Sequence, residues 1–183
     1  FRHCTGISSI PENLFSYNNK ARSFNATFYG CTGLTCSIPN NLFYNNPDVT
    51  SFNYTFGNCN NLVGDIPSDL FSQQQNVDSF FGTFSGCRNL SGYIPSNLFY
   101  TNKYVTSFAE TFYFCSGLEG EIPSNLFAEQ QNVTSFNSTF SCCSNLSGEI
   151  PANLFEKNPN VIYFSYTFND CPGLYGSIPE DLF

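Results

Sequence analysis

The sequence predicts an α/β repeat solenoid, a stack of 28-residue units in which each unit contributes one short parallel strand. The first observation behind this prediction is the dipeptide Ile-Pro, which recurs at a constant spacing of 28 residues. It stands at Ile10-Pro11, Ile38-Pro39, Ile66-Pro67, Ile94-Pro95, Ile122-Pro123, Ile150-Pro151 and Ile178-Pro179. A fixed period of about 20–50 residues is typical of supersecondary units that bury their apolar faces against one another.

The second observation is that large apolar residues recur at fixed positions of the unit. With the isoleucine as position 1, Leu stands at positions 5 and 25, Phe at positions 6, 15 and 19, Thr at position 18 and Cys at position 22. Of the 22 Phe, only Phe81 and Phe114 fall outside these columns when Phe1 is counted at position 19. Because burying one such ring contributes about 1.5–3 kcal/mol, we expect the Phe columns to form the core.

We expect the whole chain, residues 1–183, to form a single solenoid. Complete repeats span 10–37, 38–65, 66–93, 94–121, 122–149 and 150–177, and partial units span 1–9 and 178–183. Neither end carries the polar unit that normally caps a stack of repeats. The sequence therefore predicts either an excerpt of a longer protein or ends that another copy of the chain covers.

The order of residues within a unit predicts its local structure. The Leu-x-Gly-x-Ile runs at 90–94, 118–122 and 146–150 alternate as a strand does, with Leu and Ile inward and an inward Gly that allows close backbone approach. Proline ends that strand, and Pro-x-Asn-Leu-Phe predicts one short turn. The Asn, Gln and Pro residues that follow, as at 44–47 and 72–75, predict a connector.

The segment from position 12 to position 25 carries two conflicting signals. Its apolar residues are spaced by 3, 4, 3 and 3, which predicts a short helix or irregular helical turns. Its Thr, Ser and Phe content favours a strand instead. A strand, a turn and a helical return stacked in parallel describe a leucine-rich-repeat-like solenoid.

Several motifs resemble known repeats of surface proteins. The string Phe-x-x-Cys-x-x-Leu, followed by Ile-Pro and preceded by Val-Thr-Ser-Phe, resembles the BspA-like leucine-rich repeats of bacterial surface proteins, whose unit is usually shorter. The stretch 132–143 is similar to related bacterial repeats that carry Met where Phe stands here. The Asn-Leu-Ser-Gly-x-Ile-Pro runs at 89–95 and 145–151 are similar to plant-type extracellular leucine-rich repeats. The resemblance covers the whole chain and implies an extracellular, cell-surface, non-enzymatic binding or adhesion protein.

Composition and charge exclude several classes of partner. The net charge is −8 and only six residues are Lys or Arg, so nothing supplies a patch that would neutralise nucleic-acid phosphates or anionic lipids. No apolar run is long enough to span a bilayer. The absence of an initiator Met and of a signal-like segment predicts a mature or partial chain. The low charge and the many Asn, Ser, Thr and Tyr residues suit an extracellular surface.

The nine cysteines predict a buried column of thiols. Seven stand at position 22 when Cys4 is counted, and this spacing does not fit a CxxC metal clamp. Small buried thiols can instead pack as hydrophobes and reach backbone carbonyls. Cys36 replaces the strand Gly, and Cys142 stands beside Cys143. For an oxidising compartment, the alternative is a disulfide between Cys36 and either Cys4 or Cys31.

Catalytic chemistry is not predicted. The single histidine, His3, has no partner with which to build a nucleophile–base pair or a metal site. The 13 Gly are spread along the repeats and form no Gly-rich run, so no phosphate-cradling loop forms. We expect neither a cofactor nor enzymatic activity.

The outward face of the predicted strand is the candidate ligand surface, because positions 26 and 28 vary while their inward neighbours do not. Leucine-rich repeats commonly bind ligands on this face; the alternative is a plain solvated sheet face. After Thr35 and Ser37, the candidates are Val63, Asp65, Ser91, Tyr93, Glu119, Glu121, Ser147, Glu149, Tyr175 and Ser177. The two tyrosines and the acidic cluster favour a polar or cationic ligand.

Six Asn-x-Ser/Thr sequons are candidate glycosylation sites. They begin at Asn25, Asn53, Asn89, Asn132, Asn137 and Asn145. In a secreted eukaryotic protein each would accept a glycan. The alternative is coincidence, because the constant Thr at position 18 turns any Asn at position 16 into a sequon.

The leading functional prediction is a cell-surface protein that adheres to, or binds, a protein or glycan through the strand face. The alternative is a structural subunit that binds itself through the solenoid ends and forms an extracellular, glycosylated filament, since end-to-end contact gives open fibres. A remote alternative is ice binding by the Thr column at position 18. The other use of that column is to fix the register of the stack through hydroxyl contacts to backbone or to the next rung.

Overall fold

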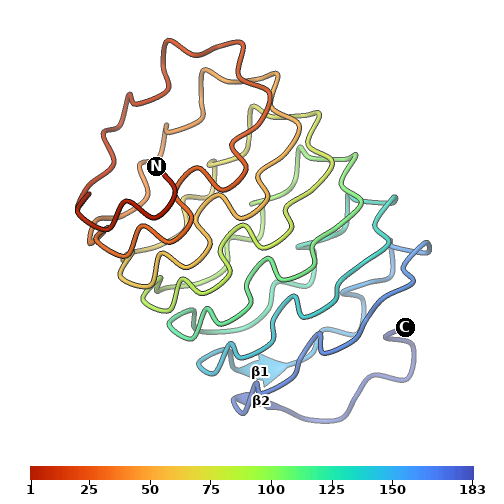
Figure 1. Cartoon of the computed structure of the whole chain (residues 1–183). Coiled ribbons are helices and arrows are strands. Elements are labelled where there is room, and N and C mark those ends of the chain that lie inside the picture. The colour runs from red at the N-terminus through yellow and green to blue at the C-terminus, as the bar shows by residue number, and fades with distance from the viewer.

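The computed structural model describes all residues 1–183 as one continuous stack of coils. Figure 1 shows successive turns of the chain lying side by side from the N-terminus to the C-terminus. The regular elements are two short strands, β1 (Gly148–Glu149) and β2 (Leu174–Tyr175), which pair in parallel. There is no helix. The helical half of the α/β prediction is therefore wrong, and turns connect the rungs instead.

The main ladder of backbone hydrogen bonds between rungs runs along positions 13 to 21. The apolar spacing predicts helical structure for this segment. Parallel bridges join the residues at position 14, which are Ser23, Ser51, Ser79, Ser107, Ser135 and Tyr163. The N–H groups of Phe52 and Tyr54 donate to the carbonyls of Ser79 and Phe81 in the next rung, at 3.2 and 2.8 Å. The Thr55 N–H, which follows these two donors in the chain, instead donates within its own rung, to the Phe52 carbonyl at 3.0 Å. Ladder bonds and tight turns thus alternate along the segment.

Left-handed residues produce this alternation. Positions 17 and 21 have positive φ in the complete rungs, for example 53° at Tyr54 and 56° at Phe114. A helix cannot continue through such residues, because each one reverses the local direction of the backbone. Successive tight turns, each closed by a hydrogen bond between residues three apart, nevertheless return apolar side chains to one side every three or four residues. The apolar spacing therefore could not separate helix from turns.

The predicted Leu-x-Gly-x-Ile strands form only in part. Between most rungs they are reduced to one backbone hydrogen bond, such as the Ser91 N–H to the Gly64 carbonyl at 3.0 Å. Isolated bridges join Gly64 to Leu90 and Gly120 to Leu146, while β1 and β2 extend the pairing by one residue. The Pro-x-Asn-Leu-Phe segment makes the expected turn, since the Leu42 N–H donates to the Pro39 carbonyl at 3.2 Å.

The core consists of the predicted apolar columns. Rings in one column stack on their counterparts in the next rung: Phe52 and Phe80 have centroids 5.8 Å apart and planes within 3° of parallel. Rings of different columns meet at an angle, as do Phe71 and Phe80 at 4.7 Å. These rings are fully buried. Offset contacts of this kind add to the hydrophobic stabilisation from burial.

The Thr column at position 18 also faces the core. The hydroxyl of Thr83 lies 2.8 Å from the Phe80 carbonyl in its own rung and 3.1 Å from the Phe52 carbonyl in the preceding rung. Thr83 is completely buried, as are Thr55, Thr111 and Thr139. The hydroxyls therefore tie neighbouring rungs in register. Ice binding by this column is wrong, because no flat threonine array reaches the surface.

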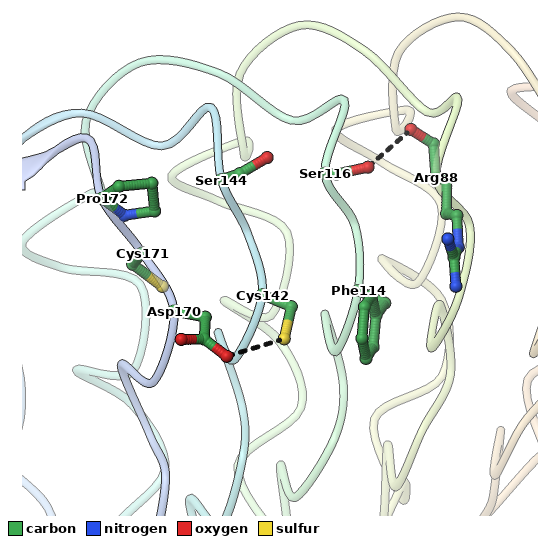
Figure 2. Close-up of a pocket in the computed structure, with 8 residues that line it drawn as sticks. All are labelled: Arg88, Phe114, Ser116, Cys142, Ser144, Asp170, Cys171 and Pro172. Carbon is green, nitrogen blue, oxygen red and sulfur yellow. Dashed lines mark hydrogen bonds between the residues drawn. The ribbon is translucent and has the colours of Figure 1, made fainter.

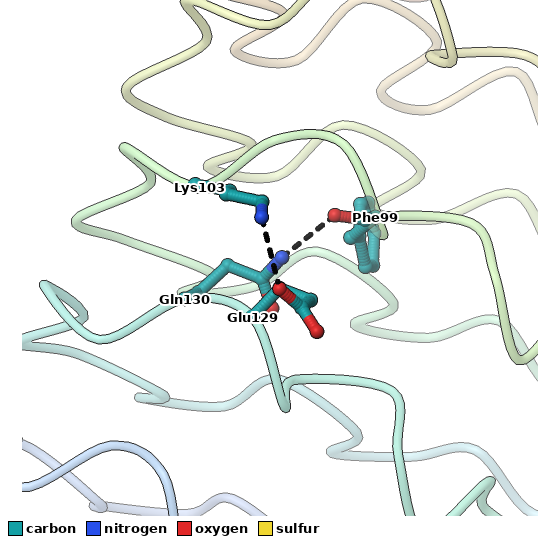
Figure 3. A network of polar contacts seen from close by, with 4 residues as sticks. All are labelled: Phe99, Lys103, Glu129 and Gln130. Atoms are coloured by element: carbon teal, nitrogen blue, oxygen red, sulfur yellow. Dashed lines mark hydrogen bonds and ion pairs between the residues drawn. The ribbon is translucent and has the colours of Figure 1, made fainter.

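A column of buried amides at position 9 replaces part of the expected connector. Its buried members are Asn46, Gln74, Asn102, Gln130 and Asn158. The Asn46 amide nitrogen donates to the carbonyls of Phe15 and Asn18 in the preceding rung, at 3.1 and 2.9 Å. The Gln130 amide nitrogen donates to the Phe99 carbonyl at 2.6 Å. Figure 3 shows this contact close to a partly exposed ion pair between Lys103 and Glu129. The carbonyls of Phe15 and Asn18 also accept N–H groups of their own rung, from Asn18 and Ala21, so each amide adds a second donor that ties neighbouring rungs together.

Candidate functional site

The predicted ligand face forms one exposed surface along the stack. Nine of its ten candidates are exposed and Ser147 is half-buried. Tyr93 and Tyr175 expose 68% and 65% of their surface, so neither ring contributes to the core. Parallel bridges such as Gly120 to Leu146 hold successive rungs in register, so the side chains at positions 26 and 28 follow one another along this face.

The glycines at position 27 shape this face rather than pack against the core. Gly120 and Gly148 have φ of 76° and 91°, and the side chain at position 28 of the preceding rung lies where a Cβ would stand. Tyr93 lies over Gly120 in this way, and Glu121 lies over Gly148. The expectation that this Gly permits close approach in the interior is therefore wrong. Its missing side chain makes room for the candidate ligand residues themselves.

A groove of about 580 Å³ crosses this face near the C-terminal end of the stack. It brings together four of the predicted residues, Glu121, Glu149, Tyr175 and Ser177. The Ile-Pro pairs of successive rungs, including Pro123 and Pro151, supply apolar walls. The groove does not include the remaining candidates, which are Val63, Asp65, Ser91, Tyr93, Glu119 and Ser147.

The groove is acidic and its carboxylates lack ionic partners. The salt bridges of the chain are Lys103 with Glu129 and Lys157 with Glu156, so Glu121 and Glu149 take part in none. Carboxylates that line a concave surface without a cation of their own attract positively charged groups and repel anions. The arrangement can therefore hold a cationic side chain next to the Tyr175 ring.

Six of the seven cysteines at position 22 are buried, as predicted, and Cys4 at the N-terminal end is half-buried. The Cys115 thiol donates to the Phe84 carbonyl at 3.1 Å, and Cys87 makes the same contact with Phe56 at 3.0 Å. Burial raises the pKa of both thiols well above their ordinary range, which suppresses the reactive thiolate. All nine cysteines are free thiols in this structure, and Cys36 is half-buried. The pairing of Cys36 with Cys4 or Cys31 stays a prediction.

The six sequons lie in two kinds of setting. Asn89, Asn132 and Asn145 are exposed on turns. Asn25 is also exposed, but its side-chain oxygen accepts hydrogen bonds from the Ser51 hydroxyl at 2.7 Å and the Asn53 N–H at 2.8 Å. Asn53 and Asn137 are half-buried. The Asn25 side chain therefore also joins neighbouring rungs, and glycosylation stays a prediction for all six sequons.

The largest pocket lies elsewhere, on the wall formed by positions 21 to 23. It has a volume of about 720 Å³, and Figure 2 shows the side chains around it. The lining residues are Arg88, Phe114, Ser116, Cys142, Ser144, Asp170, Cys171 and Pro172. In the sequence, Phe114 and Cys142 stand outside the repeated columns, but the predicted sites do not bring them together. Both occupy position 21, which was the available signal.

The structure offers no metal centre. No group of three or more His, Cys, Asp or Glu side chains is arranged to hold a metal ion. His3 is exposed, and its ring meets Tyr29 edge-on with centroids 5.3 Å apart. No helix is long or apolar enough to cross a membrane.

Comparison with known proteins finds similar solved structures but no relative in sequence. No family model matches the chain, and no curated protein matches it. A leucine-rich repeat protein from Bacteroides ovatus is 23% identical with a TM-score of 0.47, over 89% of this chain and 42% of that one. The ectodomain of the receptor kinase SOBIR1 from Arabidopsis thaliana is 17% identical with a TM-score of 0.42, over 95% of this chain and 69% of that one. The present chain thus spans less than half of the Bacteroides protein.

Proposed function

We propose that this chain is an extracellular, non-enzymatic binding protein that holds a partner protein on its strand face. The observation that carries the proposal is the groove in which Glu121, Glu149 and Tyr175 converge. These residues occupy positions 26 and 28, which differ from rung to rung and face away from the core. Residues that stabilise the stack are repeated, whereas residues that select a partner are free to vary.

The chemistry of the groove favours a cationic segment of the partner. Two carboxylates without ionic partners would pair with Lys or Arg, and an exposed tyrosine offers both a ring face and a hydroxyl. The net charge of −8 would steer a basic partner toward the chain at low salt. The proline and isoleucine walls add apolar contact beside the charges.

A low content of charged residues and many Asn, Ser and Thr support an extracellular location. Sequons on exposed turns would suit such a location, because an exposed asparagine is accessible to glycosylation. Assembly into a filament stays a separate prediction, and it does not require the groove.

Selection of peptides from a displayed random library on the purified chain tests this proposal. We expect the selected peptides to be rich in Arg and Lys, and their affinity to fall as salt rises. The double change Glu121→Gln and Glu149→Gln should weaken them by about tenfold or more, which corresponds to about 1.4 kcal/mol.

The matched control is Asp78→Asn, which removes an exposed carboxylate at position 13. That position belongs to the ladder of positions 13 to 21, and not to the strand face. It should leave the affinity of the selected peptides within about twofold, a change of only about 0.4 kcal/mol. Equal loss in the groove variant and in the control would mean that general charge, rather than the groove, attracts the peptides. Selected peptides that tolerate the groove variant would overturn the proposal.

A further inference from the structure

The pocket on the position-21 wall gathers the residues that depart from the repeat. Phe114 is one of two phenylalanines outside the Phe columns, and Cys142 is one of two cysteines outside the Cys column. Backbone bonds from Phe114 N–H to the Ser141 carbonyl and from Cys142 N–H to the Asn169 carbonyl, at 2.9 and 2.8 Å, set position 21 of adjacent rungs in register. Asp170 follows at the same position of the next rung.

The Phe114 ring projects into the pocket instead of the core. Its left-handed backbone, with φ of 56°, turns the side chain away from the stacked Phe columns. Gly30 and Gly86 occupy the same position in other rungs, so the fold itself does not require a ring there. The Arg88 guanidinium lies 4.9 Å from the ring centroid and covers one face. Figure 2 shows Phe114 between Arg88 and Cys142, so that its other face looks along the pocket.

Polar groups of several kinds surround this ring. The Asp170 carboxylate lies 3.8 Å from the Cys142 sulfur at the far end of the pocket, and the Ser116 and Ser144 side chains lie along one side. Together they offer a carboxylate acceptor, guanidinium donors and two hydroxyls that both donate and accept. The charges of Arg88 and Asp170 are opposite and stand at opposite ends, so the pocket as a whole is close to neutral.

We propose that this pocket is a second binding site, independent of the strand face, and that it takes a neutral oligosaccharide lying along the stack. An aromatic face flanked by carboxylate, guanidinium and hydroxyl groups matches a sugar ring, which has an apolar C–H face and a rim of hydroxyls. A neutral ligand uses both charged groups as hydrogen-bond partners, whereas an ion would be repelled by one of them. The pocket spans four rungs, about 14 Å at the usual rung spacing, which suits a short linear chain of sugars.

Titration of the reduced chain with cellohexaose, chitohexaose and maltohexaose, followed by calorimetry, tests this site. We expect at least one of these probes to bind with a Kd of about 1 mM or tighter. Phe114→Gly should weaken it by about tenfold or more, since the stacking face is lost. Glycine is compatible with the left-handed backbone here and stands at this position as Gly30 and Gly86, so the variant should keep the fold.

Two control variants assign the result to the pocket. Phe81→Ala removes the other phenylalanine outside the columns, which packs on Tyr54 at 4.8 Å and does not line this pocket. Tyr175→Ala removes a ring of the strand-face groove. Both should leave oligosaccharide binding unchanged.

Three results would overturn the proposal. They are no binding of any of the three probes, binding that Phe114→Gly leaves unchanged, and binding that Tyr175→Ala removes. The last result would place the sugar on the strand face. Because cationic peptides and neutral sugars are separate probes, failure of this site leaves the strand-face proposal to its own experiment.

Discussion

The Tyr54 hydroxyl donates a hydrogen bond to the Glu110 carboxylate at 2.8 Å, across two rungs of the stack. Gly82 stands between them in the same column, and its missing side chain gives room to the Tyr54 ring. All three residues have positive φ, between 53° and 61°. One glycine thus allows two polar side chains that are 56 residues apart to meet on the outer wall.

Replacing this glycine should destabilise the chain. A Cβ in Gly82→Ala would overlap the Tyr54 ring and would sit on a left-handed backbone, so we expect a loss of about 2 kcal/mol or more in unfolding free energy. Urea denaturation measures the change. Gly6→Ala is the matched control, because no atom lies within 4 Å of the added carbon, and it should shift stability by at most about 0.5 kcal/mol. Equal effects of the two variants would contradict this account.

Tyr54 should also make stability depend on pH in the alkaline range. Burial, followed by the hydrogen bond and the negative charge of Glu110, raises the Tyr54 pKa well above its ordinary value. A raised pKa favours the neutral phenol in the folded state. The stabilisation that the Tyr54 phenol gives to the folded state is therefore complete below pH about 10, the ordinary pKa of tyrosine. It is lost as the pH rises toward the folded-state pKa.

The variant Tyr54→Phe separates this effect from other titrations. The phenylalanine variant should lose about 0.5–1.5 kcal/mol near neutral pH with the hydrogen bond. Above pH about 10 its thermal midpoint should fall less steeply than that of the native chain, because it lacks the titrating phenol. Parallel curves for the two proteins would show that Tyr54 is not the group responsible.

The buried amide column should be sensitive to single changes. Asn46→Ala removes the two hydrogen bonds that join its rung to the carbonyls of Phe15 and Asn18 and opens a cavity, so we expect a loss of about 2–4 kcal/mol in unfolding free energy. Asn45→Ala changes the same residue type one position earlier, where the side chain is exposed. Chemical denaturation should find this control within about 0.5 kcal/mol of the native chain. A small effect at both positions would argue against a structural role for the column.

Thiol reactivity should divide the cysteines into two sets. After reduction and removal of the reductant, an alkylating agent at pH about 8 should modify Cys4, Cys36 and Cys142 first, since these are only half-buried. The other six are buried, and desolvation raises their pKa, for example to about 11 at Cys171. Peptide mapping by mass spectrometry gives the order of labelling. Modification of Cys87 or Cys115 as fast as Cys142 would contradict the buried column.

The same mapping without prior reduction tests the candidate disulfide. A bridge would join the Cys36 peptide to the peptide of Cys4 or Cys31 under non-reducing conditions. Its absence from protein purified out of an oxidising compartment would exclude that pairing, because such a compartment favours disulfide formation.

The buried columns could be predicted from the sequence because the stack repeats one environment in every rung. Phe52, Thr83 and Cys115 each recur at a fixed position, and a side chain that meets its own copy must keep its size and its hydrogen-bonding capacity. The same logic could have found the amides at position 9, which are Asn or Gln in every complete unit. The prediction of a connector rests instead on a general tendency, since polar residues near proline usually lie in exposed loops.

The repeat in the sequence is enough to predict that the chain is a stack, that the Phe, Leu, Thr and Cys columns face its core, and that positions 26 and 28 carry its variable surface. The three-dimensional structure adds that turns replace the helix, because residues such as Tyr54 and Phe114 take a left-handed backbone that apolar spacing does not encode. It also decided that Phe114, Cys142 and Asp170 line one pocket. Residues 28 positions apart become neighbours only when backbone bonds between rungs fix their register.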